Sequence, residues 1–372
     1  MKKLGFGLMR LPLLDKADPA SIDVEQVKKM VDLFIERGFT YFDTAWMYCG
    51  FHSEHVVREA LVERYPREAF TLATKLHSGF FNSLEDRDKV FEEQMKKTGV
   101  EYFDYYLLHG ISGSSYEKYE KFDCFRWLKE KKAQGLVKTV GFSFHDNARL
   151  LDEILTRHPE MEFVQLQINY LDWESPLIQS RECYEVAVKH GIPVIVMEPV
   201  KGGTLARVPG EAQKLLKERA PELSVPSWAV RFAASLDQVM MVLSGMSNVD
   251  QVMDNVSFME VFKPLDADER KLLGDVADMI NSATAVPCTG CAYCTDGCPR
   301  KIPIPQFFSL YNEDMREAKD KGWSANETFY RMLAGEDKRA GDCIGCGQCE
   351  RICPQHLPII KHLQEVSGHY DK

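Results

Sequence analysis

The chain has 372 residues, of which 45% are hydrophobic and 27% charged, and this composition indicates a globular protein with one large domain or two ordinary ones. Its formal net charge of −10 argues against a nucleic-acid partner, because phosphate binding needs clustered Lys and Arg and the sequence has no long basic run. We expect no membrane partner either, since no segment approaches the roughly 20 apolar residues that a membrane helix requires.

The N-terminal segment MKKLGFGLMRLP carries two lysines, but Arg10 and Pro12 interrupt its apolar run and leave it too short for a signal peptide. The chain contains 11 cysteines, and without an export signal these are better explained as metal ligands than as disulfides. We therefore expect a cytoplasmic protein in a reducing compartment.

Residues 23–37 read DVEQVKKMVDLFIER and predict an amphipathic helix with Asp23 as its N-cap. Gly38 ends this helix, and FTYFDT follows as a strand. The same order of helix, stop and strand recurs before AFTLATK, YFDYYLLH, LVKTVGFS and IPVIVM. With GFGLMRL, FVQLQINY and QVMMVLSG, the sequence predicts about eight short apolar strands separated by amphipathic helices.

Nearly continuous apolar strands that alternate with helices indicate a parallel sheet buried on both faces. Eight such units in about 260 residues fit a closed (β/α)8 TIM barrel, whose usual size is ~250 residues. A doubly wound open sheet is the alternative, and the absence of a GxGxxG turn after the first strand argues against it. The composition then changes, so we predict a barrel over 1–262, a connecting helix over 263–284 and a cysteine-rich, mainly helical domain over 285–372.

Polar residues close several of the apolar strands. In a parallel barrel the chemistry lies at the carboxyl ends of the strands, so these residues are expected to converge on one mouth. The steps from Asp43 to Lys75, His109 and Ser143 are 32, 34 and 34 positions, about the length of one strand and helix unit. The full set is Asp43, Lys75, His109, Ser143, Gln167, Asn169 and Glu198.

Each of these residues alone has a structural explanation, such as capping the next helix. An Asp, a Lys and a His at one level, with Tyr48 five positions after Asp43, instead favour a catalytic group. A Tyr phenol has a pKa near ~10, and a close Lys ammonium is expected to lower it. Asp43 would keep a buried Lys75 charged, and His109 would orient the substrate oxygen. The set predicts a proton donor aimed at a carbonyl that receives hydride.

The motifs FDTAWMY, LATK and LLHG resemble those of the aldo/keto reductases, (β/α)8-barrel enzymes that use nicotinamide cofactors and an Asp, Tyr, Lys, His tetrad. The resemblance covers roughly residues 3–260 and implies tetrad roles for Asp43, Tyr48, Lys75 and His109, with Tyr48 as the general acid/base. It also implies that SGMSNVDQVMDN, after the eighth strand, holds the adenosine phosphates and adenine. The implied cofactor-binding residues are Ser143, Gln167, Met197, Ser244, Gly245, Ser247, Gln251 and Asn255.

Departures from the family pattern concern the cofactor. Met197 stands where an aromatic side chain often stacks on the nicotinamide, and Gly245 and Gln251 stand where NADP-preferring members carry cations. Without cations, the 2′-phosphate would lose its charge-assisted hydrogen bonds. We expect NAD(H) or NADP(H), with NADH favoured, although a loop could supply Lys201 or Arg207.

The C-terminal segment contains the spacing C-x2-C-x2-C-x3-CP twice, which is the bacterial ferredoxin pattern for 4Fe–4S clusters. Zinc is the alternative, but its sites usually combine two separated C-x2-C pairs. In two-cluster ferredoxins the fourth cysteine of each run ligates the other cluster. One predicted cluster therefore uses Cys288, Cys291, Cys294 and Cys353, and the other uses Cys343, Cys346, Cys349 and Cys298, with added helices between the two runs.

These observations predict an oxidoreductase that moves hydride between NAD(P)H and a small-molecule aldehyde, ketone or alcohol, with two fused 4Fe–4S clusters. A second hypothesis is exchange of single electrons with a redox protein partner through the clusters, and a third is a structural or oxygen-sensing role for them. Hydride carries two electrons and each cluster takes one, and no flavin motif is present to join the two processes. The first hypothesis is therefore favoured. We also expect that the C-terminal segment covers the barrel mouth.

Overall fold

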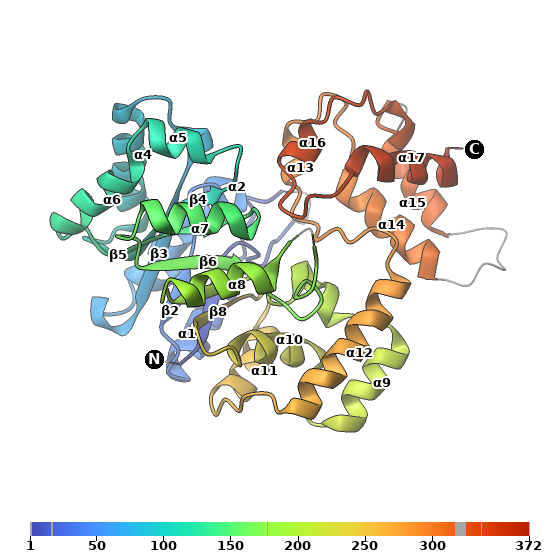
Figure 1. The fold of residues 1–372 in the computed structure, drawn as a ribbon, viewed down its shortest axis with the longest axis horizontal. Helices are drawn as coiled ribbons and strands as arrows, with labels where there is room; N and C mark the ends of the chain where they lie inside the picture. Colours follow the sequence, from blue (N-terminus) through green and yellow to red (C-terminus); the bar gives the residue numbers. More distant parts are fainter. Residues whose placement is uncertain (1, 16–17, 177, 317–324, 336, 372) are drawn as a thin grey trace.

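The computed structural model describes residues 2–15, 18–176, 178–316, 325–335 and 337–371. Eight parallel strands form a closed barrel in chain order, and the last strand pairs with the first (Figure 1). The prediction of a (β/α)8 barrel is thus confirmed. The strands are β1 (Leu4–Gly7), β2 (Tyr41–Asp43), β3 (Thr71–His77), β4 (Phe103–Ile111), β5 (Val137–Phe144), β6 (Phe163–Gln167), β7 (Val194–Met197) and β8 (Val239–Gly245).

Helices and short turns connect the strands around the outside of the barrel. The first helix begins where the sequence predicts, because the Asp23 side chain accepts a hydrogen bond from the Gln26 N–H at 3.0 Å, and the left-handed Gly38 follows its end. The connecting helices are α1 (Val24–Glu36), α2 (Tyr48–Phe51), α3 (Ser53–Val57), α4 (Leu84–Thr98), α5 (Tyr116–Lys121), α6 (Cys124–Ala133), α7 (Ala148–Arg157), α8 (Ser180–Lys189), α9 (Gly210–Arg219), α10 (Val225–Ala234) and α11 (Val249–Met259), with the turns η1 (Arg58–Val62), η2 (Arg67–Ala69), η3 (Ser78–Phe80) and η4 (Lys201–Ala206).

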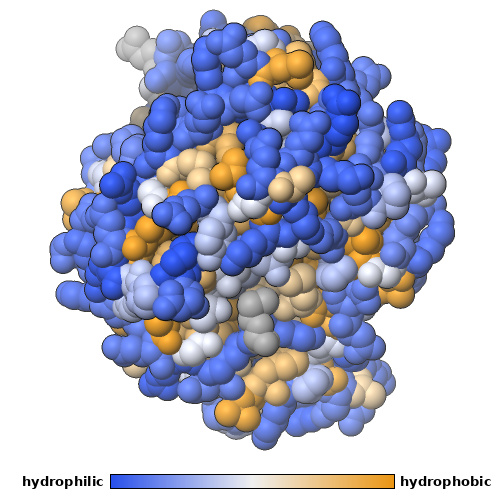
Figure 2. All heavy atoms as spheres, turned by 90° about the vertical axis from the view of Figure 1, so that its left-hand side faces the viewer, coloured by the Kyte–Doolittle hydropathy of each residue, from blue (hydrophilic) through white to orange (hydrophobic). Residues whose placement is uncertain are grey.

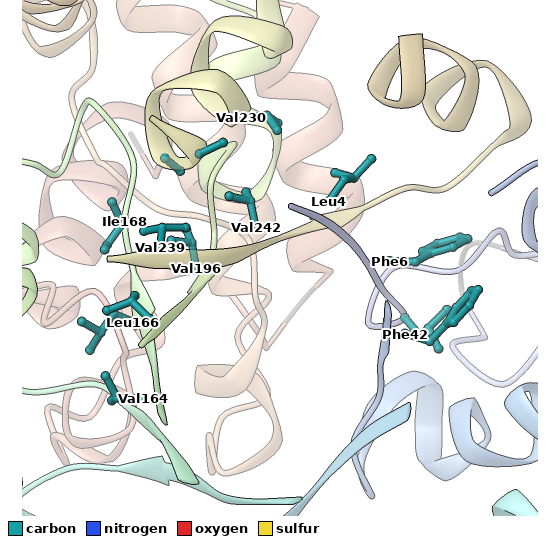
Figure 3. Packing of buried hydrophobic residues seen from close by; sticks show 14 of the residues in the cluster. Leu4, Phe6, Phe42, Val164, Leu166, Ile168, Val196, Val230, Val239 and Val242 are labelled. Atoms are coloured by element: carbon teal, nitrogen blue, oxygen red, sulfur yellow. The ribbon is translucent and has the colours of Figure 1, made fainter. Parts of the chain in front are cut away.

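The two faces of the strands bury different side chains. Outward-facing residues such as Phe6, Phe42 and Val164 pack against the helices (Figure 3). Inward-facing apolar residues fill the barrel as a separate cluster that includes Tyr41, Ala73, Leu107, Phe163, Ile195 and Met241. Because side chains alternate along a strand, the residues two positions further on face inward again at the carboxyl end. These are Asp43, Lys75, His109, Gln165, Met197 and Leu243.

The helix α12 (Ala267–Ala283) joins the barrel to the C-terminal domain. Asp266 and Glu269 form a capping box at its start, and Glu269 also forms a buried ion pair with Arg231 of α10 at 3.1 Å. The ion pair holds α12 against the barrel, and the helix leads to the second lobe that is orange to red in Figure 1.

The C-terminal domain is mainly helical and has its own core, in which Phe307, Phe308, Tyr330 and Leu363 are buried together. The helices predicted between the two cysteine runs are present as α14 and α15, and residues 317–324 of that stretch lie outside the described residues. The elements of this domain are α13 (Tyr293–Asp296), α14 (Ile304–Arg316), α15 (Ala325–Ala334), η5 (Ala340–Asp342), α16 (Gln348–Arg351) and α17 (Ile359–Tyr370).

The barrel side of the molecule, seen in Figure 2, is mostly hydrophilic, with hydrophobic side chains scattered among the charged ones. Within the described part of the chain, every helix is too short or too polar to cross a membrane.

Candidate active site

A cavity of about 390 Å³ lies at the carboxyl ends of the strands, where Asp43, Tyr48 and His109 contribute to its wall. The opposite wall comes from the C-terminal domain and includes Cys291, Tyr293 and Gln355. The C-terminal domain therefore covers the barrel mouth, as the sequence-based hypothesis expected.

Two close approaches between loops hold the C-terminal domain over this mouth. Arg10, which follows β1, donates a hydrogen bond to the Thr289 carbonyl at 3.4 Å. Gly202 in η4 has a φ of +63°, and a Cβ at this position would lie 2.1 Å from the same carbonyl oxygen. Only glycine permits both this backbone conformation and this approach, so the loop after β7 is shaped to receive the C-terminal domain.

An ion pair lies at the base of the cavity. Lys75 Nζ contacts Asp43 Oδ1 at 2.5 Å and the Thr44 carbonyl at 2.7 Å, and Gln165 Nε2 lies 3.4 Å from Asp43 Oδ2. Lys75 is 0% exposed and does not itself line the cavity, whereas Asp43 and Gln165 do. Burial raises the pKa of Asp43 and lowers the pKa of Lys75, while each charge opposes the shift of the other. The pair stabilises both charges where water is excluded.

Tyr48 stands between this pair and His109. Its ring centroid lies 5.0 Å from Lys75 Nζ and 5.8 Å from the His109 ring centroid. Burial raises the pKa of Tyr48 well above its ordinary value, and Tyr293, Asp43 and Glu198 raise it further. Burial thus outweighs the lowering that was expected from Lys75, and the Asp43 carboxylate beside the ammonium offsets part of its effect. Tyr48 is therefore a protonated phenol at neutral pH.

His109 is a neutral imidazole. It is 6% exposed, and burial, followed by the neighbouring His77, Lys75 and His145, holds its pKa well below the ordinary value. Among the described residues, His109 Nδ1 has no hydrogen-bond partner although it is buried. A buried polar atom without a partner is uncommon, and this one belongs to a residue that also lines the cavity.

His77 gives the fold a measurable pH dependence. Burial, followed by the charge of Lys118, lowers the pKa of His77 to about 4, against 6.5 in the unfolded chain. The unfolded state thus binds more protons between these values, and its proton uptake destabilises the fold as pH falls from 6.5 to 4. We expect His77→Gln, which stays neutral, to reduce the loss of unfolding free energy over this range by up to about 3 kcal/mol.

The measurement is urea unfolding of wild type and His77→Gln at pH 7 and pH 5, between which about 2 kcal/mol of the difference is expected. Comparing the two proteins at each pH removes effects of acid that they share. Equal losses in both proteins would show that His77 does not titrate in this way.

The predicted cofactor-binding residues mostly lie together. In the β8–α11 segment, Asn255 Nδ2 donates to Ser244 Oγ at 2.7 Å, and Gln251 Oε1 accepts from the Ser247 N–H at 2.7 Å. The N-terminus of α11, an eleven-residue helix, starts here and suits a phosphate. The predicted cofactor contacts that line the cavity are Gln167, Met197, Ser244, Gly245, Ser247, Gln251 and Asn255.

Ser143 is the predicted contact that the structure does not bring to the cavity wall. It is fully buried, and its Oγ accepts a hydrogen bond from the Gly110 N–H at 2.7 Å. This hydroxyl therefore supports the β4–β5 edge in the structure, and Ser143 lies outside the lining residues.

Several cavity residues escaped the prediction for identifiable reasons. Gln165 could have been found, because it precedes Gln167 by two positions on β6 and so shares its inward face. Arg10 follows β1, which ends in glycine and therefore has no polar side chain that would mark the mouth. Tyr293 and Gln355 belong to the C-terminal domain and line the cavity because that domain docks on the barrel. No pattern within the barrel sequence marks those three.

The eight cysteines of the C-terminal domain form two groups. One group lines a small cavity and consists of Cys298, Cys343, Cys346 and Cys349. In the other group Cys288, Cys291 and Cys353 all raise the pKa of Cys294, after burial. Within the described residues no three His, Cys, Asp or Glu side chains converge closely enough for a single metal ion. Four thiols gathered around one small cavity fit a multi-iron cluster that is held by thiolates.

Comparisons with known proteins agree with this architecture. Residues 3–278 match the model of the Aldo/keto reductase family, and residues 287–358 match the model of the 4Fe-4S dicluster domain. The chain therefore belongs to the aldo/keto reductase family and ends in a 4Fe–4S dicluster domain. It is an oxidoreductase.

Curated relatives cover most of the barrel. The chain is 25% identical over 286 residues to an uncharacterised oxidoreductase, YqkF, of Bacillus subtilis, covering 69% of this chain and 86% of YqkF. It is 26% identical over 263 residues to the methylglyoxal reductase DkgA of Salmonella typhimurium, covering 68% of this chain and 85% of DkgA.

Solved structures share the barrel. The aldo-keto reductase AKR11C1 from Bacillus halodurans, in its holo form, has a TM-score of 0.59 and 26% identity, over 74% of this chain and 91% of that protein. An aldo-keto reductase from Klebsiella pneumoniae in complex with NADPH has a TM-score of 0.58 over 74% of this chain and 90% of that one. Its 17% identity indicates the fold alone.

Proposed function

We propose that the protein reduces a small aldehyde or ketone with NAD(P)H, or oxidises the corresponding alcohol. The observation that carries this proposal is a single cavity that contains Tyr48, His109, the Asp43 end of a buried ion pair and the β8–α11 segment suited to a dinucleotide. A cavity of about 390 Å³ has the size of a small-ligand site.

The nicotinamide, when bound, supplies or accepts the hydride. In the proposed mechanism Tyr48 donates its phenolic proton to the carbonyl oxygen, since its raised pKa keeps it protonated. His109, neutral because it is buried, hydrogen-bonds and orients the same oxygen. Lys75 Nζ lies 5.0 Å from the Tyr48 ring, so its charge favours the phenolate that remains, and the bond to Asp43 keeps the ammonium charged in this buried position.

We propose the cofactor contacts that the sequence predicts, and we add Arg10, which lines the same cavity. The Arg10 side chain lies against Gly245, where a Cβ would be 3.5 Å from Arg10 Cδ. Gly245 ends β8 at the segment proposed for the phosphates, so the guanidinium can reach a cofactor phosphate there. Lys201 is held by Asp172 at 2.5 Å, and Arg207 lies outside the described cavity lining. With Lys201 paired and Arg207 outside the lining, we favour NADH as the cofactor.

Each of the two groups of cysteines is assigned to one cluster. We propose that one 4Fe–4S cluster is held by Cys288, Cys291, Cys294 and Cys353 and the other by Cys343, Cys346, Cys349 and Cys298. The second set coincides with the lining of the small cavity. The proposed division of the chain is a barrel over 1–262, a linker helix over 263–284 and the cluster domain over 285–372.

Replacing Cys298 with serine tests this exchange of ligands between the runs. We expect Cys298→Ser to change the same electron paramagnetic resonance signal of the reduced protein as Cys346→Ser, because both residues belong to one group. Cys291→Ser serves as the matched control in the other group. A Cys298→Ser spectrum that matches Cys291→Ser would contradict the assignment.

A second candidate function is the exchange of single electrons with a redox protein partner. The clusters, when bound, supply one-electron transfer. Cys291 lines the same cavity as Tyr48, and Cys346 of the other group is exposed to solvent, so the two groups lie between the cavity and the surface. This arrangement favours electron transfer between the cavity and a partner at the surface. Because the sequence has no flavin motif to convert hydride into single electrons, we rank this function second to hydride transfer.

The direct test of the first proposal is an assay of NADH and NADPH oxidation with a panel of small aldehydes and ketones, on protein that contains its clusters. We expect turnover that depends on the carbonyl compound, with a lower KM for NADH than for NADPH. Oxidation that needs no carbonyl but requires an electron acceptor protein would support the second candidate instead.

A further inference from the structure

A pair of glutamine side chains connects the C-terminal domain to the barrel beside the proposed nicotinamide site. Gln355 Nε2 donates to Gln167 Oε1 at 2.9 Å, and Gln167 Nε2 donates to Gln355 Oε1 at 3.0 Å. The residues are 188 positions apart, are 4% and 6% exposed, and both line the cavity that contains Tyr48. They therefore form a buried reciprocal amide contact between the two domains.

Two charged side chains determine which way each amide points. Asp172 Oδ2 accepts a hydrogen bond from Gln167 Nε2 at 2.9 Å, so the opposite orientation would place the Gln167 oxygen against a carboxylate. Lys201 Nζ donates to Gln355 Oε1 at 3.1 Å, so the opposite orientation would place the Gln355 amide nitrogen against an ammonium. Lys201 and Asp172 are also paired with each other at 2.5 Å.

This network leaves Gln167 with little freedom. Its two amide protons are donated to Asp172 and Gln355, and one lone pair of its oxygen accepts from Gln355. The second lone pair is the remaining hydrogen-bonding capacity of the side chain. A primary carboxamide in the cavity could donate to this lone pair without any rearrangement of Gln167.

Gln355 is also close in sequence to a proposed cluster ligand. It lies two residues after Cys353, and no helix or strand separates them. A cluster bound by Cys353 would therefore restrict the backbone that carries the Gln355 amide.

We propose that Gln355 is a positioning residue that fixes the Gln167 amide for the carboxamide of the cofactor, so that the cluster domain contributes to nicotinamide affinity. This inference rests on the proposed use of a nicotinamide cofactor. Gln355 acts through Gln167, and its removal leaves a buried amide of Gln167 without one donor and one acceptor.

The test is the affinity of cluster-loaded protein for NADH and NADPH, measured by calorimetry. We expect Gln355→Ala to weaken binding about tenfold, the effect of a loss of roughly one buried hydrogen bond. Gln167→Ala should weaken binding to a similar extent, and the double variant should be little worse than either single variant, because the two side chains act as one unit. Gln306→Ala, an exposed glutamine of the same domain, is the matched control and should bind as wild type does.

The outcomes separate this inference from the function on which it depends. Failure of wild type to bind either dinucleotide would overturn the proposed function. Wild-type binding with unchanged or tighter binding by Gln355→Ala, or additive losses in the double variant, would overturn the role of Gln355 alone. The visible absorption of the clusters and the melting temperature of each variant are recorded as well, and Gln355→Glu provides a second variant of the same size if Gln355→Ala does not fold.

Discussion

Replacing Tyr48 with phenylalanine is expected to lower kcat for carbonyl reduction by a factor of about 10²–10⁴, the contribution of a positioned general acid. The ring remains to pack beside Lys75 and His109, and only the phenolic proton donor is lost. Cofactor affinity should therefore stay within about twofold of wild type, because Tyr48 acts on the substrate oxygen.

The measurement is steady-state kinetics combined with a binding assay for the dinucleotide. Tyr311→Phe, in the C-terminal domain and outside the described cavity lining, is the matched control for loss of a phenol. Full activity of Tyr48→Phe would remove Tyr48 from the mechanism, and loss of cofactor binding together with activity would indicate a structural role.

Breaking the buried ion pair is expected to have the largest effect on stability. Lys75→Met leaves the Asp43 carboxylate buried without its cation, and we expect the unfolding free energy of the barrel to fall by about 3–5 kcal/mol. The double variant Asp43→Asn with Lys75→Met removes both charges and should recover much of that loss, while carbonyl reduction stays impaired in both proteins.

Urea unfolding followed by tryptophan fluorescence measures this effect, since Trp228 is fully buried in the barrel. Lys96→Met, which breaks an exposed pair with Glu93, is the control and should change stability by less than about 1 kcal/mol. Equal losses for Lys75→Met and the double variant would show that the cost comes from packing and that charge contributes little.

The barrel and its central residues were predictable because they depend on local periodicity. The strands alternate with helices at a nearly constant spacing, and this spacing places Asp43, Lys75 and His109 at one mouth. Tyr48 was predictable for a related reason, since it follows Asp43 within the same loop. The cysteine spacing likewise predicted the 4Fe–4S dicluster domain.

Properties that depend on solvent exclusion or domain docking were beyond the sequence. The pKa of Tyr48 rises because burial outweighs the nearby Lys75, and Tyr293 from the other domain raises this pKa further. Gln355 meets Gln167 across 188 positions, and Gly202 admits the Thr289 carbonyl, so both contacts require the docked structure. The hydrogen bond that Ser143 Oγ accepts from the Gly110 N–H is likewise a contact that no motif encodes.

The central claim is that hydride passes directly from the nicotinamide to a carbonyl carbon of the substrate, in the barrel mouth beneath the cluster domain. It is tested most directly by reducing an aldehyde in ordinary water with dinucleotide that carries deuterium at the transferable position of its nicotinamide. The account predicts one deuterium on the carbinol carbon of the product, detected by mass spectrometry or NMR. A carbinol carbon that carries hydrogen from the solvent would contradict it. The electrons would then have reached the carbonyl without the hydrogen atom of the nicotinamide.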